Sequence, residues 1–130
     1  MATLEQARAA FALEKVRGIE ENREKFKTQL LKLPARLHAN GLGQTVAFYL
    51  SAGEEKPEWI ICGWLEEWLR RPEQVYGEQR LKGMKLVECI TGSRLPEGRG
   101  QSVEDLYQQA SVEARALSIW LKRFAEAFLK

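Results

Sequence analysis

The sequence predicts an all-α protein, a compact single-domain bundle of five to seven helices. Apolar residues recur at the three- and four-residue spacing of a helix face along most of the chain. No segment shows the alternating β-branched pattern that is typical of a strand. The 130 residues are 45% hydrophobic and 29% charged, which suffices for one core. No repeat or low-complexity linker divides them, so we expect one domain over residues 1–130.

Two helices are expected at the start of the chain. The first covers residues 3–21, since Thr3 and Gln6 have the spacing of a capping box. The second begins near Asn22 and can continue past Pro34. A proline lacks the backbone N–H, so Pro34 is expected to break or kink this helix, or to stand in the first turn of a short third helix.

A turn is expected where Asn40 and Gly41 end this stretch. Glycine just past a helix can adopt the left-handed conformation that satisfies the last carbonyl groups. We therefore interpret Asn40, Gly41 and Gly43 as a structural turn, followed by a short apolar helix over residues 42–50.

The second half of the chain predicts three further helices. Pro72 is expected to end the first of these helices, and Gly83 lowers the helix propensity of the second. Ser102 and Asp105 have the spacing of a capping box at the start of the third. A glycine-rich loop over residues 91–101 precedes the last helix. The three helices are expected at residues 58–71, 77–90 and 102–130.

Residues that could carry catalysis are scarce. His38 is the only histidine, and no serine or cysteine has a spacing that marks a nucleophile–base pair. Cys62 and Cys89 stand 27 positions apart without a CxxC motif, which argues against both a zinc site and a disulfide. We expect free, buried thiols, no catalytic residues, no metal, no cofactor and no small-molecule substrate.

The first residues of the chain and the length of its apolar runs indicate where in the cell the protein is expected. The first ten residues carry charges where a signal peptide has an apolar segment, and no apolar run is long enough to span a membrane. We therefore expect a cytoplasmic protein that does not interact with membranes.

The formal net charge of +2 hides an uneven distribution. Residues 22–40 contain five basic residues and one acidic residue, whereas residues 41–69 are acidic. Such a basic segment is typical of a surface that follows phosphates, but also of an ordinary solvated helix face. The five basic residues are Arg23, Lys25, Lys27, Lys32 and Arg36.

Four tryptophans are more than a small core needs. Trp59, Trp64 and Trp68 belong to the acidic section of the chain, and Trp120 to the last helix. We expect at least two of them in the core. A tryptophan left on the surface of an acidic section suits a protein interface better than base stacking.

Three segments together resemble a known family. The stretch from Leu33 to Phe48, which includes Asn40-Gly41-Leu42-Gly43-Gln44, is similar to the most characteristic segment of the small subunit of the type III-B CRISPR (Cmr) effector complex. The opening segment around Arg8 and the closing segment around Lys122-Arg123 resemble the first and last helices of the same family.

This resemblance implies a non-catalytic helical subunit of an RNA-guided antiviral ribonucleoprotein. Its implied partners are other Cmr-complex subunits, copies of itself, and the backbones of guide RNA and target RNA, while target cleavage belongs to neighbouring subunits. Base pairing reads sequence in such complexes, so the protein needs only backbone and shape contacts. The expected RNA-backbone residues are Arg8, Lys122 and Arg123 from the segments that resemble the family, together with Lys25, Lys32 and Arg36 from the basic segment.

Two other functions remain open at this point. A helical adaptor that binds only proteins would leave the basic segments without a role. A helix-turn-helix DNA binder would use residues 26–50, but its second helix is too apolar to read bases.

Overall fold

The computed structural model describes residues 3–71, 74–76, 86–91 and 103–129, and every regular element in these ranges is a helix. This confirms the predicted all-α fold, with a helix number inside the expected range. No strand occurs in the described residues. The helices are α1 (Leu4–Arg17), α2 (Arg23–Ser51), α3 (Pro57–Leu69), α4 (Leu86–Thr91) and α5 (Val103–Phe128).

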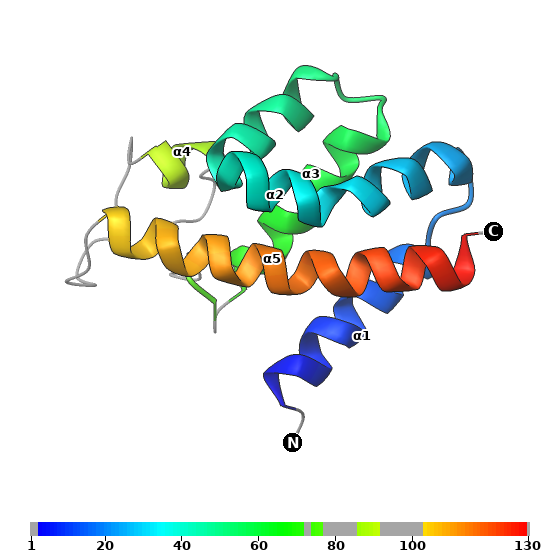
Figure 1. Ribbon diagram of the computed structural model, residues 1–130, viewed down its shortest axis with the longest axis horizontal. Coiled ribbons are helices and arrows are strands. Elements are labelled where there is room, and N and C mark those ends of the chain that lie inside the picture. Colours follow the sequence, from blue (N-terminus) through cyan, green and yellow to red (C-terminus); the bar gives the residue numbers. More distant parts are fainter. Residues whose placement is uncertain (1–2, 72–73, 77–85, 92–102, 130) are drawn as a thin grey trace.

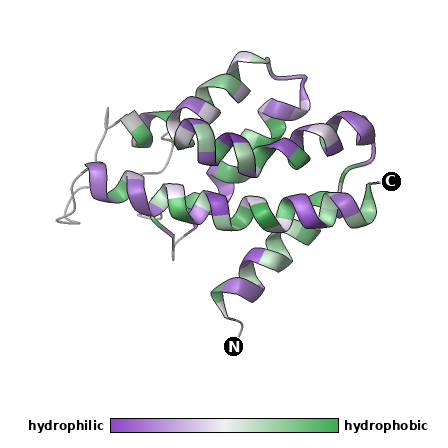
Figure 2. Cartoon of the chain, in the orientation of Figure 1, coloured by the Kyte–Doolittle hydropathy of each residue, from purple (hydrophilic) through white to green (hydrophobic). Residues whose placement is uncertain are grey.

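The longest axis of the molecule follows α5, which packs against both α2 and α1 (Figure 1). The helix α3 packs against α2, and the short α4 lies near one end of α5. Polar and apolar residues are interspersed along α2 and α5 (Figure 2). In the first part of α2 the buried residues Phe26, Leu30, Leu33 and Leu37 recur every three or four positions, so they share one side of the helix. No helix in the described ranges is long and apolar enough to cross a membrane.

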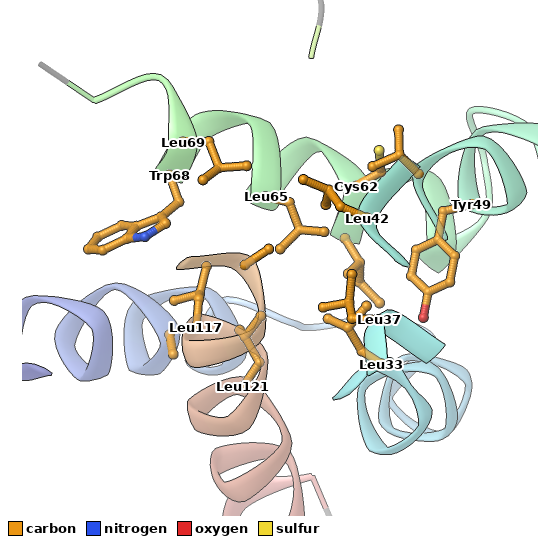
Figure 3. Close-up of a cluster of buried hydrophobic side chains, with 14 of the residues drawn as sticks. Leu33, Leu37, Leu42, Tyr49, Cys62, Leu65, Trp68, Leu69, Leu117 and Leu121 are labelled. Carbon is orange, nitrogen blue, oxygen red and sulfur yellow. The ribbon is translucent and has the colours of Figure 1, made fainter. Parts of the chain in front are cut away.

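The core forms where α2, α3 and α5 meet (Figure 3). Leu65 and Trp68 of α3 face Leu117 and Leu121 of α5, and all four side chains are at most 1% exposed. Tyr49, from the second half of α2, turns its hydroxyl toward the first half of the same helix. The two halves of α2 therefore pack against each other as well as against their neighbours.

The start of α1 has the predicted capping box, but its end differs from the expectation. The Thr3 backbone N–H donates to Gln6 at 2.8 Å, and the Gln6 backbone N–H donates to the Thr3 hydroxyl at 3.1 Å. The helix ends at Arg17, so the expected extension to residue 21 is wrong. Gly18 closes it because its N–H donates to the carbonyls of Glu14 and Val16, and glycine is a poor helix former.

Pro34 does not break α2. Gly41 is the only residue within α2 that has non-helical φ and ψ angles, so the helix continues past Pro34, which was one of the outcomes that the sequence left open, and a break at the proline is wrong. Leu33 and Leu37 on either side of the proline are buried in the core. Their packing holds the helix across the backbone hydrogen bond that a proline removes.

Several predictions fall outside the described residues. They concern residues 77–85 of the helix expected at residues 77–90, residues 92–101 of the loop expected at residues 91–101, and the Ser102 cap. Thr91 ends α4, so the expectation that it begins the loop is wrong. The helix expected at residues 58–71 is present as α3, although it begins at Pro57 and ends at Leu69.

Candidate nucleic-acid interface

Lys25 and Lys32 form an exposed pair on one side of α2. They are seven residues apart, about two helical turns, so they share a side of the helix. Both are exposed, and no ion pair with another described residue involves either ammonium group. These two charges are therefore available to a ligand from solvent.

Arg36 continues the same side of α2 but is occupied by its own helix. Its guanidinium donates to the side-chain oxygen of Gln29 and to the Tyr49 hydroxyl, the latter at 3.2 Å. It also lies 5.0 Å from the ring centroid of Phe48 and 5.5 Å from that of Tyr49. Arg36 thus ties the two halves of α2 together and is only partly exposed.

The bend between these halves lies at Gly41, with φ 82° and ψ 166°. The positive φ agrees with the expectation, but the ψ angle is extended and not that of a left-handed helical cap. This combination is restricted almost entirely to glycine. Asn40 beside it is exposed.

Tyr107 of α5 holds this bend. The Gly43 backbone N–H donates to the Tyr107 hydroxyl at 2.9 Å, and a Cβ on Gly41 would lie 3.3 Å from the same oxygen. The sequence gives no local sign of this contact because Tyr107 is 64 residues from Gly43. The segment that most resembles the family is therefore shaped by the packing of α2 on α5.

Arg8 lies in a network that joins three helices. Its guanidinium donates to both carboxylate oxygens of Glu113 on α5, at 2.6 and 2.9 Å, and to Glu5 at 3.0 Å. The indole N–H of Trp68 on α3 donates to the same Glu113 carboxylate at 2.9 Å. The Arg8 side chain is only 15% exposed. The guanidinium that we expected to contact RNA thus faces two carboxylates within the protein.

The Glu113 carboxylate remains charged in this setting. Burial alone raises its pKa, but the hydrogen bonds from Arg8 and Trp68 outweigh this effect, so the pKa lies below the usual value. The Arg8 pKa is raised, chiefly by its hydrogen bond to Glu113. A charged, hydrogen-bonded pair with this geometry stabilises the contact between α1 and α5.

Lys122 and Arg123 lie on different sides of α5. Lys122 shares the side of Arg115, seven residues earlier, which approaches His38 of α2, whereas Arg123 lines a hollow with Glu5 and Trp120 on the side of α1. α2 runs antiparallel to α5, because Arg23 donates to the Phe128 carbonyl at 2.7 Å while His38 and Arg115 approach to 3.4 Å. Arg123 is exposed and Lys122 partly exposed.

The side of α2 that carries the lysines does not face α5. Lys32 precedes His38 by six residues, which turns it about 120° away from the side of α2 that meets α5. The structure therefore places Lys25, Lys32 and Arg36 on one side of α2, and Arg123 on the side of α5 that meets α1.

The remaining chemistry-bearing residues show no catalytic arrangement in the described part of the chain. Burial raises the pKa of the Cys62 thiol to about 12, so it is protonated at neutral pH. His38 is exposed. No group of three or more His, Cys, Asp or Glu side chains in the described ranges could hold a metal ion. The expectation for the Cys89 thiol concerns a side chain outside the described ones.

Comparison with protein families matches the chain to the family described as CRISPR-associated protein (Cas_Cmr5), over residues 4–128. The match spans all five helices, including the opening, central and closing segments that carry the resemblance. The chain therefore belongs to the Cmr5 family, the small subunits of the type III-B CRISPR Cmr complex.

Proposed function

We propose that the chain is a non-catalytic subunit that stacks along an RNA-guided antiviral complex in the cytoplasm and contacts the backbone of the guide–target duplex. Its partners are other Cmr subunits, further copies of itself, and both RNA strands. The observation that carries the RNA contact is the exposed Lys25–Lys32 pair, whose charges no ion pair with a described residue offsets.

The geometry of this pair suits a backbone contact. Seven residues at 1.5 Å rise place Lys25 and Lys32 about 10 Å apart along the helix axis, so both can reach phosphates of one duplex. Lysine binds phosphate as a point charge, and such a contact does not distinguish one base from another. We assign Lys25 and Lys32 as the primary RNA residues, with Arg36 as a partly engaged neighbour.

The other expected cations take different places in this proposal. Lys122 and Arg123 on α5 are secondary RNA residues, which an RNA duplex held between adjacent subunits would contact on two different sides of that helix. Arg8 has a structural role because Glu113 and Glu5 occupy its guanidinium.

The test is the salt dependence of RNA binding by the purified protein. We expect weak binding of an RNA duplex without sequence preference, and a log-affinity against log-salt slope of about −2 to −3. The double variant Lys25→Gln/Lys32→Gln should flatten this slope by between about 1 and 2, because each lost phosphate contact removes nearly one released counterion. Lys56→Gln, at an exposed lysine before α3, is the matched control. An unchanged slope in the double variant would refute the assignment.

A protein-only adaptor is the second candidate function. Val112 and Ile119 on α5 are 59% and 49% exposed, and exposed apolar side chains grouped on one helix are typical of a protein contact. Under this alternative, neutralising the α2 lysines would leave RNA affinity unchanged, whereas Ile119→Lys would disrupt assembly of the complex.

A further inference from the structure

An open groove of about 690 Å³ lies between the end of α1, the start of α2, and α3. Its apolar lining comes from Ile19, Phe26, Ile60 and Trp64. Ile60 is 39% exposed and Trp64 is partly exposed, whereas Phe26 is buried beneath them. The rings of Phe26 and Trp64 stack with their centroids 5.7 Å apart. The groove therefore presents apolar and aromatic surface to solvent.

The remaining lining of this groove is strongly acidic. Among the residues that the structure describes, Lys15 is the only basic one that lines the groove, and the Lys15 ammonium already pairs with Glu67 at 2.9 Å. Four exposed glutamates line the groove, and no ion pair with another described residue involves their carboxylates. They are Glu14, Glu20, Glu21 and Glu55.

The segment between α1 and α2, which carries Glu20 and Glu21, is fixed by the residues on either side of this pair. Ile19 is 5% exposed, and its carbonyl accepts a hydrogen bond from Arg23 at 3.1 Å. Asn22 has φ 57° and ψ 34°, a left-handed conformation that asparagine tolerates better than most residues. The segment between α1 and α2 is thus anchored, and the groove exists before any ligand binds.

We propose that this groove binds a helical segment of a partner protein that carries arginines beside apolar anchor residues. Arginine suits both parts of the groove, since its guanidinium pairs with carboxylates and stacks on aromatic rings. Apolar anchors of the same segment would cover Ile60 and Trp64. RNA is the wrong occupant because the glutamates repel phosphates. The groove is therefore a protein-binding surface of opposite charge to the Lys25–Lys32 pair.

Amide NMR spectra of the labelled protein test this proposal with two synthetic helical peptides of equal length. Leucines at i, i+4, i+7 and i+11 are flanked by arginines in one peptide and by glutamates in the other. The arginine peptide should shift the amides of residues 18–22 and 60–64, and the glutamate peptide should not. Glu55→Lys should lower the affinity for the arginine peptide about fivefold or more. Glu54→Lys should have little effect on this affinity, because Glu54 is exposed next to Glu55 but does not line the groove.

Four results would overturn the proposal. Equal binding of both peptides, or equal effects of Glu55→Lys and Glu54→Lys, would remove the charge complementarity. Shifts of the groove amides that grow with protein concentration alone would make a second copy of this chain the occupant. Shifts of the groove amides on addition of an RNA duplex that persist in the Lys25→Gln/Lys32→Gln variant would make the groove part of the RNA surface. None of these results depends on whether Lys25 and Lys32 bind RNA.

Discussion

At the scale of single residues, the Glu113 carboxylate accepts hydrogen bonds from Arg8 on α1 and from Trp68 on α3. The sequence alone could not reveal this site. A lone glutamate among the apolar residues of α5 looks like an ordinary polar position, and its partners are 105 and 45 residues away. The expectation that Arg8 contacts RNA rests on its place in the opening segment that resembles the family, and nothing local in the sequence marks Glu113 as its partner.

A double-mutant cycle tests the structural role of Arg8. Arg8→Met alone should lower the free energy of unfolding by about 3 kcal/mol, because it leaves a buried carboxylate without its cation. Arg8→Met/Glu113→Met should lose less than the sum of the two single variants, with a coupling of between about 1 and 3 kcal/mol. Urea unfolding measures all three. Additive losses within about 0.5 kcal/mol would contradict the proposed pairing.

The depressed pKa of Glu113 makes a prediction about pH. A carboxyl group whose pKa is lower in the folded state stabilises the protein above its unfolded pKa, near 4.5, and this stabilisation is lost as the pH falls through the folded value. The urea midpoints of the wild type and Glu113→Gln should therefore differ by a constant amount above about pH 5 and converge below pH 4.5. The exposed Glu104→Gln is the control. A difference that does not shrink in acid would contradict the pKa assignment.

At the scale of helices, the sequence predicted the type of secondary structure better than it predicted where each helix begins and ends. The helical periodicity and the Thr3 cap were sufficient to predict the fold and the start of α1. The end of α1 could not be predicted in this way. The sequence left open whether α2 breaks at Pro34 or continues through it, because the long-range burial of Leu33 and Leu37 that outweighs the local preference of proline is not visible in the sequence. The Gly41 bend was placed correctly in sequence, but its dihedral angles depend on packing against Tyr107.

Two glycine substitutions should have opposite effects. Gly41→Ala should cost between about 1 and 3 kcal/mol of stability, since its φ of 82° and ψ of 166° disfavour any side chain. Gly63→Ala is the matched control. Gly63 is exposed in α3 with nothing within 4 Å of an added Cβ, so alanine should stabilise the helix by up to about 1 kcal/mol. Equal effects in thermal unfolding would contradict the special backbone at Gly41.

At the scale of the whole molecule, the net charge of +2 conceals two surfaces of opposite sign. The Lys25–Lys32 side of α2 attracts phosphates, whereas the glutamates around the groove attract cations. Segment charges indicated a basic and an acidic part of the chain. The structure adds which of the basic side chains are exposed and which are held by internal carboxylates.

Retention of target RNA by the assembled Cmr complex is the most direct test of the RNA role. Lys25→Glu/Lys32→Glu in every copy of the subunit should speed release of target RNA at least about tenfold near physiological salt, because two phosphate contacts are lost per copy. Lys56→Glu should leave release unchanged. Release at the wild-type rate from a complex shown to contain the double variant would contradict the RNA role and favour the protein-only adaptor.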